Sequence, residues 1–394
     1  MMSQAMGMPG VELTAPPPLS VYVHIPWCVR KCPYCDFNSH EASGELPEAR
    51  YIAALVADLE SALPQVWGRT VQSVFLGGGT PSLLSEKGLD DLLVALRARL
   101  QLAPNVEITM EANPGTFEQA RFKAYAGAGV NRLSIGVQSF NSQHLKALGR
   151  IHDGDTARRA IEIAAQYFAN FNLDLMYGLP DQTSAQALQD IEIALSYQPH
   201  HLSCYQLTLE PHTAFYNHPP TLPDGDAVAQ LGELIEARLS EAGYAHYETS
   251  AFAQPGYRCA HNLNYWTFGD YLGLGAGAHG KLSSAKSIAR EMRHKNPQAY
   301  MKAMEAGNAI QEQHEVTAAE LPFEFMMNAL RLCEGIPVDL FEQRTGLSFA
   351  VLSQYLQQAE QRGLITRDFR WLKPTQLGQR FLNDLLQIFL PNTD

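Results

Sequence analysis

The sequence predicts an α/β protein, with a partial (β/α)6-type, TIM-like barrel followed by a C-terminal, mainly helical, winged-helix-like domain. Three observations indicate this fold class. Strand-like and helix-like segments alternate over the first 250 residues, polar residues follow the predicted strands at one end, and the pattern changes near Pro322. With 394 residues, the chain is long enough for two or three domains.

The predicted organisation has four parts. Residues 1–18 are rich in proline and are expected to form a flexible tail. Residues 19–250 are expected to form the barrel domain, and residues 251–315 a connecting segment. Residues 316–394 are expected to form the C-terminal domain.

Alternation of strands and helices is the main signal for the first domain. Apolar residues with period two, or in short runs, predict strands. These strands are Ser20–Ile25, Val71–Leu76, Val106–Met110, Arg132–Val137, Phe171–Met176, His201–Leu207 and Tyr244–Thr249. Helical spacing predicts helices over Tyr51–Leu63, Ser85–Leu100, Phe117–Ala128, Thr156–Phe168, Ala185–Tyr197 and Ala227–Ala242. This order is typical of parallel βαβ units, in either a barrel or a doubly wound sheet.

The C-terminal part has a different pattern. Helices are predicted at Phe323–Leu332, Val338–Arg344, Phe349–Arg362 and Thr375–Phe389, and a hairpin between the last two. Helices followed by a hairpin resemble a winged-helix module, but a fold does not imply a function. The net charge of −12 and the lack of a basic run on the third helix predict that the chain has no nucleic-acid partner.

Three of the six cysteines, Cys28, Cys32 and Cys35, lie close together after the first predicted strand. A structural zinc site needs four ligands, and no second close pair of cysteines or histidines completes one. The C-x3-C-x2-C spacing instead favours a [4Fe-4S] cluster, whose irons are held by cysteine sulfur. Three cysteines leave one iron open to a small molecule. Because Pro33 disfavours a helix, we expect a loop around the cluster.

Composition indicates a soluble protein, with 46% hydrophobic and 18% charged residues. No run approaches the ~18 apolar residues of a membrane helix, and the start lacks the regions of a secretory signal. Six cysteines do not form a disulfide framework in a chain of this size, and cluster thiolates need a reducing compartment. We therefore expect a cytoplasmic location.

Polar or glycine-rich groups follow successive predicted strands. The cysteines follow the first strand, Gly77–Pro81 the second and Glu111–Gly115 the third. Gln138 follows the fourth, and Asp174 lies inside the fifth. Taken singly, each has a structural explanation, such as a turn or a buried hydrogen-bond partner. Together they favour a barrel or partial barrel with a site at the carboxyl ends of its strands.

A glycine-rich stretch, Asp270–Gly280, lies between the two predicted domains. It lacks the final glycine, the following helix and the acidic residue of a dinucleotide-binding fingerprint. It predicts a close approach of the backbone to a neighbouring group, with the adenine side of a bound cofactor as one candidate.

The order of motifs carries a family resemblance. The motifs are Tyr22-x-His-x-Pro-x-Cys-x3-Cys-x2-Cys, Gly-Gly-Gly-Thr-Pro-Ser, Glu-Ala-Asn-Pro, Gly-Val-Gln-Ser-Phe and Asp-Leu-x-x-Gly-Leu-Pro. This set resembles the radical S-adenosylmethionine superfamily and, within it, the oxygen-independent coproporphyrinogen III oxidases and their relatives, over nearly the whole chain. The resemblance implies that the three cysteines hold a [4Fe-4S] cluster and that S-adenosylmethionine binds beside it.

The resemblance also implies which residues contact S-adenosylmethionine. The matching positions are Tyr22, Tyr34, Gly78, Gly79, Thr80, Glu111, Gln138, Arg150 and Asp174. Glycines let the backbone approach the ligand, and carboxylates can accept hydrogen bonds from its hydroxyl or amino groups. Arg150 can pair with its carboxylate, although Leu148-Gly-Arg also fits a surface turn.

Two features resemble the heme-chaperone, HemW-type branch of this family. The oxidases carry a fourth cysteine where this chain has Phe37. His261-Asn-Leu-Asn-Tyr265-Trp matches the H-N-x-x-Y-W motif associated with heme binding in that branch. Imidazole is a common axial ligand of heme iron and aromatic faces stack on the macrocycle, so His261 and Tyr265 are the predicted heme residues. The alternative is a loop histidine that packs between Tyr265 and Trp266 and ligates nothing.

These resemblances predict a heme chaperone that binds heme and transfers it to acceptor hemoproteins, soluble or membrane-bound. No catalytic residue is assigned, and coproporphyrinogen III oxidase activity is not expected because Phe37 replaces the fourth cysteine. The alternative is a radical S-adenosylmethionine enzyme acting on a porphyrinogen, which the retained cofactor motifs favour. The sequence leaves the identity of the acceptor and the formation of a homodimer open.

Overall fold

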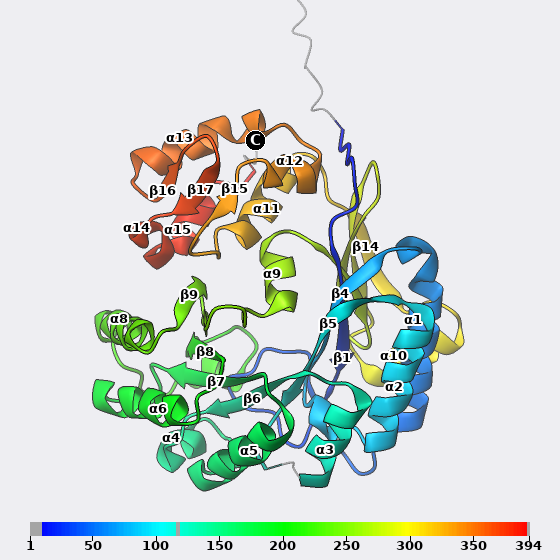
Figure 1. The fold of residues 1–394 in the computed structure, drawn as a ribbon, viewed down its shortest axis with the longest axis vertical. Helices are drawn as coiled ribbons and strands as arrows, with labels where there is room; N and C mark the ends of the chain where they lie inside the picture. Colours follow the sequence, from blue (N-terminus) through cyan, green and yellow to red (C-terminus); the bar gives the residue numbers. More distant parts are fainter. Residues whose placement is uncertain (1–9, 116–118, 392–394) are drawn as a thin grey trace, which may run out of the picture.

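The computed structural model describes residues 10–115 and 119–391. Within them, the central sheet has 12 strands in the order β14-β13-β12-β11-β1-β4-β5-β6-β7-β8-β10-β9. Its middle consists of parallel strands that follow one another in sequence and curve around a common interior (Figure 1). These strands are β1 (Leu19–Ile25), β4 (Thr70–Gly78), β5 (Gln101–Ala112), β6 (Arg132–Gln138), β7 (Phe171–Tyr177) and β8 (His201–Gln206). The predicted partial (β/α)6-type barrel is confirmed.

Helices cover the outer face of the curved sheet (Figure 1). They are α1 (Glu48–Val66), α2 (Glu86–Arg99), α3 (Gln119–Ala128), α5 (Gly154–Tyr167), α6 (Ser184–Ser196) and α8 (Gly225–Glu241), with the short α4 (Ser142–Ala147) and α7 (Ala214–Asn217). The predicted helix at Phe117–Ala128 appears as α3, and Phe117 itself lies outside the described residues. In the described part of the chain, no helix has the length and apolar character needed to cross a bilayer.

Local sequence explains where these helices begin. The side chains of Ser85, Asp153, Thr183 and Asp224 accept hydrogen bonds from backbone amides in the first turns of α2, α5, α6 and α8. Each therefore satisfies a donor that the helix itself cannot pair. At Thr183 the side chain of Gln186 completes a capping box.

Both edges of the sheet include strands that the sequence did not predict, although the outermost strand, β9, matches the predicted strand Tyr244–Thr249. Residues 251–315 were expected to connect two domains, yet they add strands at each edge. Strand β10 (Ala251–Ala253) pairs antiparallel with β8 and with β9 (Ala245–Glu248). Strand β11 (Asp270–Leu274) pairs parallel with β1. Three antiparallel strands continue from it, namely β12 (His279–Ser283), β13 (Ile288–Arg293) and β14 (Ile310–Glu315), with α10 (Pro297–Glu305) between the last two.

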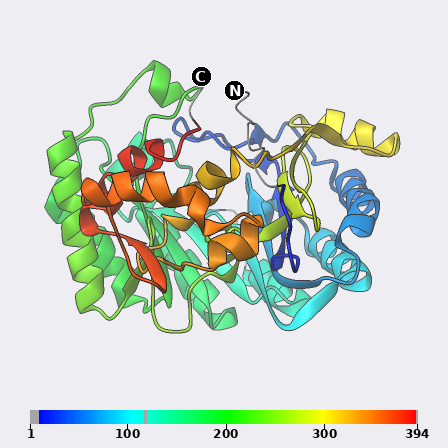
Figure 2. The same ribbon diagram turned by 90° about the horizontal axis from the view of Figure 1, so that it is seen from above.

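The C-terminal segment builds a second hydrophobic core. It contains α11 (Leu321–Ala329), β15 (Ile336–Pro337), α12 (Leu340–Thr345), a 3-10 turn (Phe349–Leu352), α13 (Ser353–Gln361), β16 (Ile365–Arg367), β17 (Trp371–Pro374), α14 (Gln376–Arg380) and α15 (Leu382–Gln387). The view from above shows this segment over one end of the barrel (Figure 2). The single helix predicted for Thr375–Phe389 is wrong, because Phe381 has non-helical dihedral angles (φ −111°, ψ 45°) and divides it into α14 and α15.

The segment before β1 also packs against this second core. Val11 and Leu13 are buried within it, and the Leu13 amide donates to the Ala285 carbonyl at 2.9 Å. The predicted mobile tail is therefore wrong for these positions, because two apolar side chains among the prolines find a buried surface. Residues 1–9 lie outside the described residues.

Candidate functional site

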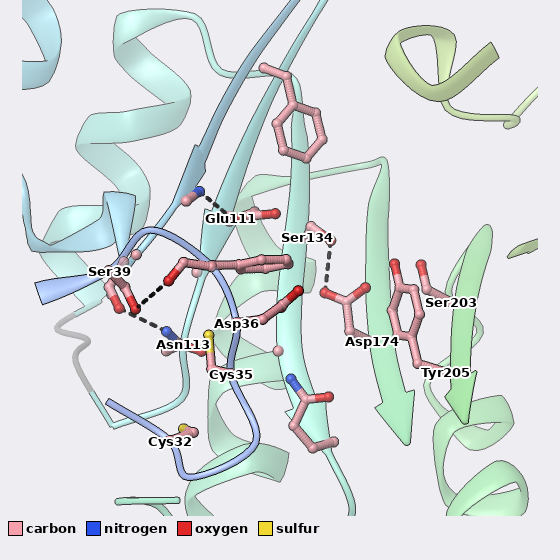
Figure 3. Close-up of a pocket in the computed structure, with 18 of the residues that line it drawn as sticks. Cys32, Cys35, Asp36, Ser39, Glu111, Asn113, Ser134, Asp174, Ser203 and Tyr205 are labelled. Carbon is pink, nitrogen blue, oxygen red and sulfur yellow. Dashed lines mark hydrogen bonds between the residues drawn. The ribbon is translucent and has the colours of Figure 1, made fainter. Parts of the chain in front are cut away.

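A cavity of about 770 Å³ runs through the interior of the partial barrel, from the cysteine loop to helix α9 (Ala260–Trp266). Figure 3 shows the side chains of Cys35, Glu111, Asp174 and Tyr205, from four different segments, around this space. Every site residue predicted from the sequence lines it. These are Tyr22, Cys28, Cys32, Tyr34, Cys35, Gly78, Gly79, Thr80, Glu111, Gln138, Arg150, Asp174, His261 and Tyr265.

The cysteines lie on a loop at one end of the cavity. Cys28 ends the short strand β2 (Trp27–Cys28), which pairs with β3 (His40–Glu41) and so closes the loop at its base. All three thiols are free and partly buried. Burial raises the pKa of the Cys28 and Cys35 thiols, so the charge of a bound metal is needed to hold them as thiolates.

The cysteine set fits a [4Fe-4S] cluster. Three free thiols from one loop line the same cavity. In a four-iron cluster each cysteine binds a different iron, so its thiolates surround a volume instead of a point. The donor set of three free cysteines at a cavity mouth meets that requirement.

The glycine-rich loop after β4 leaves no room for side chains. Gly78 has φ +110°, and a Cβ atom there would lie 2.4 Å from the His24 ring. A Cβ at Gly79 would lie 2.5 Å from the Trp27 carbonyl oxygen. The Gly79 and Thr80 amides donate to the Ile25 and Trp27 carbonyls, both at 2.7 Å, and bind this loop to the start of the cysteine loop. Backbone therefore faces the cavity beside the cysteines.

Two carboxylates lie behind this loop. Glu111 accepts from the Gly78 amide at 3.0 Å, and burial, together with the charge of Asp174, raises its pKa to about 8. Asp174 accepts from Ser134 at 2.9 Å and from Asn172 at 2.8 Å, and burial also raises its pKa. Such carboxylates gain from a cationic or hydroxyl-bearing ligand, because it stabilises the ionised form. S-adenosylmethionine carries both kinds of group.

Arg150 reaches into the cavity next to the cysteines. Its guanidinium donates to Cys32 Sγ at 3.6 Å, to Asn113 Oδ1 at 2.6 Å and to the Gly136 carbonyl at 2.8 Å. Leu148 and Gly149 do form a turn, but the Arg150 guanidinium after it contacts the cysteine loop. Gln138 lies beside a β-bulge in β6 and has φ +66°, a geometry that re-aims a side chain at the end of a strand.

The opposite end of the cavity is closed by α9, which carries the H-N-x-x-Y-W sequence. The segment was expected to be a loop, but Glu107 of β5 accepts from the amides of Ala260 and His261, at 3.2 and 3.3 Å, and so satisfies the first turn of a helix. The His261 ring stacks on Phe75 with centroids 4.9 Å apart.

His261 is 3% exposed, and its two ring nitrogens have different surroundings. Nδ1 lies 3.1 Å from Ser73 Oγ, whereas Nε2 is buried and has no hydrogen-bond partner. Burial, with the charge of Arg132, lowers the pKa of His261 to about 3. The imidazole is therefore neutral at physiological pH, which is the form that ligates metal ions.

Sequence reasoning missed several polar residues that line the same interior. They are His24, Asn113, Arg132, Ser134, Asn172, His201 and Ser203. A signal was available, because side chains alternate along a strand. Asn172 lies two residues before Asp174 on β7, so the two face the same side of the strand, and Asn113 directly follows the end of β5, two residues after Glu111.

Comparisons with known proteins agree with this geometry. The sequence profile of the Radical SAM superfamily matches residues 22–194, and the HemN C-terminal domain matches residues 316–381. The heme chaperone HemW of Escherichia coli K12 is 50% identical over 95% of this chain and 98% of its own. The chain belongs to the HemW family. The HemW proteins of Haemophilus influenzae, at 46% identity over 95% of this chain and 98% of its own, and of Mycobacterium tuberculosis H37Rv, at 36% over 84% and 86%, are further relatives.

A solved structure supports the fold. The coproporphyrinogen III oxidase HemN of Escherichia coli, a radical SAM enzyme, aligns with a TM-score of 0.81 at 24% identity, covering 95% of this chain and 90% of its own. Helix α9 lies between the two regions that the family profiles match.

Gly78→Ala tests the cofactor loop. We expect a loss of about 2–4 kcal/mol in the free energy of unfolding, because the new Cβ meets the His24 ring in a left-handed backbone conformation. Urea unfolding measures it. Gly243→Ala is the matched control, since Gly243 has φ +84° but no atom within 4 Å of a Cβ, and it should lose only about 1 kcal/mol. Equal losses in the two variants would contradict the close packing of this loop.

Glu111→Gln tests the raised pKa. A carboxyl group with a folded pKa of about 8 stays neutral in the ligand-free fold, while the unfolded chain ionises above about 4.5. Stability is therefore lost as pH rises between these values, and the glutamine variant avoids that loss. We expect it to be more stable than wild type by roughly 1–3 kcal/mol at pH 7.5 and about equal at pH 4.5.

Urea unfolding of the ligand-free protein at both pH values provides the measurement. The exposed Glu162→Gln serves as the matched control for the same substitution at the surface. A Glu111→Gln variant that is less stable than wild type at pH 7.5 would show that the carboxylate is ionised and stabilising in the ligand-free fold.

Proposed function

We propose that this chain is a heme chaperone that binds heme at the α9 end of the barrel cavity and transfers it to acceptor hemoproteins. One observation carries the proposal. The Nε2 atom of His261 is buried, unpartnered and part of a neutral imidazole in the cavity wall. A buried polar atom without a partner is costly in a folded protein unless it serves a ligand, and axial coordination of iron is what such a nitrogen provides.

Tyr265 completes the proposed heme site. Its ring lies 5.0 Å from the His261 ring and stacks on Tyr271 with centroids 4.2 Å apart. Burial raises the pKa of the Tyr265 hydroxyl well above its usual value, so the ring acts as a neutral aromatic surface. Aromatic faces of this kind pack against a macrocycle.

The cysteine end fits a [4Fe-4S] cluster with S-adenosylmethionine beside it. When bound, such a cluster supplies an open iron and electrons. The chain's own residues do the positioning: Cys28, Cys32 and Cys35 bind iron, Gly78 and Gly79 leave room for the ligand, and the remaining predicted residues, Tyr22, Tyr34, Thr80, Glu111, Gln138, Arg150 and Asp174, contact it. The free state of the cysteines supports a reducing compartment, and we propose the cytoplasm. We further propose that the acceptors of the heme are hemoproteins, either membrane-bound or soluble. We also propose that the protein forms a homodimer.

A second function, that of a radical S-adenosylmethionine enzyme acting on a porphyrinogen, is favoured by one observation. All residues predicted to contact S-adenosylmethionine line a single cavity with room for a second ligand. Against it stands Phe37, which is 56% exposed at the cavity mouth where the oxidase pattern has a thiol. We therefore propose that heme carriage, not decarboxylation, is the function.

Reciprocal substitutions separate the two ends of the cavity. Replacing Cys28, Cys32 and Cys35 with alanine should abolish the broad visible absorption of the cluster but leave heme uptake measurable, because the His261 end is intact. His261→Ala should leave the cluster spectrum unchanged and shift or remove the heme Soret band. The exposed His218→Ala is the control and should change neither. An unchanged heme spectrum in His261→Ala would refute this ligand assignment.

The absence of a fourth cysteine gives a direct test between the functions. Reconstituted protein with S-adenosylmethionine and a reductant is expected to leave coproporphyrinogen III undecarboxylated, as followed by chromatography of the porphyrins after oxidation. The same preparation should take up heme about one to one and pass it to an apo-hemoprotein. Robust decarboxylation would favour the enzyme and contradict the carrier.

A further inference from the structure

Arg132 is a buried arginine at the α9 end of the cavity. Among the described residues, no carboxylate forms a salt bridge with its guanidinium. It begins β6, is only 2% exposed and lines the cavity. Its Nε is buried and has no hydrogen-bond partner. A buried guanidinium is expensive unless its donors are satisfied, so such a group in a native fold indicates a ligand.

The acidic groups around Arg132 are occupied or neutral. Cys259, Glu107, Tyr247 and Asp174 are the acidic groups that act on its charge. The Cys259 thiol donates to Glu107 Oε1 at 3.6 Å. Glu107 accepts from the first amides of α9, and Asp174 accepts from Ser134 and Asn172. In the described part of the chain, the guanidinium therefore has two carboxylates nearby but no hydrogen bond to either.

Arg132 faces the same end of the cavity as His261. Both side chains line the cavity, and Glu107, which accepts from the His261 amide at 3.3 Å, is one of the groups that act on the Arg132 charge. Among the described residues, two other arginines line the cavity, and both Arg30 and Arg150 lie near the cysteines. His201, which is also at the α9 end, has a pKa lowered well below its usual value by burial and is neutral. Arg132 is thus the cation that a ligand at this end meets.

We propose that Arg132 binds a carboxylate in the deep end of the cavity, and that this carboxylate is a propionate of the bound porphyrin. The inference rests on the proposed function and deepens it. A porphyrin ligated at its iron by His261 carries its propionates on one edge of the macrocycle, and a guanidinium matches a carboxylate through two parallel hydrogen bonds. His261 then holds the metal and Arg132 sets which way the macrocycle faces.

The test compares heme with heme dimethyl ester, whose propionates are esterified and uncharged. Full-length, cluster-reconstituted protein is titrated anaerobically with each porphyrin, and the Soret band reports binding. We expect wild type to bind heme about 10- to 100-fold more tightly than the diester. Arg132→Gln should bind heme about 10- to 100-fold more weakly than wild type, but should bind the diester with the affinity of wild type. The variant should therefore no longer distinguish heme from its diester.

Two further variants keep the result interpretable. Arg132→Lys retains the charge without the two-pronged geometry and should discriminate only partly. The exposed Arg159→Gln on α5 removes an arginine of equal charge outside the cavity and should behave as wild type. If Arg132→Gln does not fold, wild type and Arg132→Lys still decide the matter.

Three outcomes overturn the inference. Equal affinities of wild type for heme and its diester would show that no propionate is recognised. A loss of both affinities in Arg132→Gln would assign the residue to the fold alone. Discrimination retained in full by Arg132→Gln would place the propionate elsewhere. Each leaves the heme-chaperone proposal standing, whereas wild type that binds neither porphyrin contradicts that proposal and this inference together.

Discussion

The structure depends on the burial of polar side chains inside a barrel of parallel strands. Alternation along each strand turns one row of side chains inward, and here that row is largely polar. A buried polar group is stable only when it is paired, and the partners come from neighbouring strands. Asn172 donates to Asp174 at 2.8 Å and lies 2.7 Å from His201 Nδ1. His201 Nε2 lies 2.9 Å from the Tyr247 hydroxyl, which accepts from the Cys259 amide at 3.3 Å. One hydrogen-bonded chain thus runs from the cysteine half of the cavity to the start of α9.

The βα alternation of the barrel could be predicted because amphipathic helices and short apolar strands have distinct periods. The added strand β11 could not, because it is buried on both faces and shows no alternation. The glycines in that stretch do mark a close backbone approach, but the neighbours are strands. A Cβ at Gly273 would lie 2.0 Å from the His279 carbonyl oxygen, and one at Gly275 would lie 2.5 Å from that of His24. The pairing of β11 with β1, which is distant in the sequence, determines the structure of this stretch, and the local sequence pattern does not reveal it.

The candidate site also contains residues that the sequence could predict and residues that it could not. Cys28 and Glu111 could be found because they follow predicted strands, and Asp174 because it lies inside the next strand of the same ordered series. Helix α9 could not be predicted from its local sequence, because its N-cap residue, Cys259, makes no side-chain capping bond. The Ala260 amide in its first turn is instead satisfied by Glu107, which lies 153 residues earlier in the chain. Arg132 could not be predicted in this way, because it lies at the start of its strand and not at the end where the sequence motifs gather.

The position of α9 also explains what the C-terminal domain does for the barrel. Arg331 stacks over the Trp266 ring at 4.3 Å, and Arg344 donates to the Thr267 carbonyl at 3.2 Å. Phe268, just beyond α9, packs edge-on against Phe325 of α11 with centroids 5.6 Å apart. Helix α9 is therefore held from the barrel side by Glu107 and from the other side by this domain. The resemblance to a winged helix did not predict this role, because it follows from which surface is buried rather than from the fold.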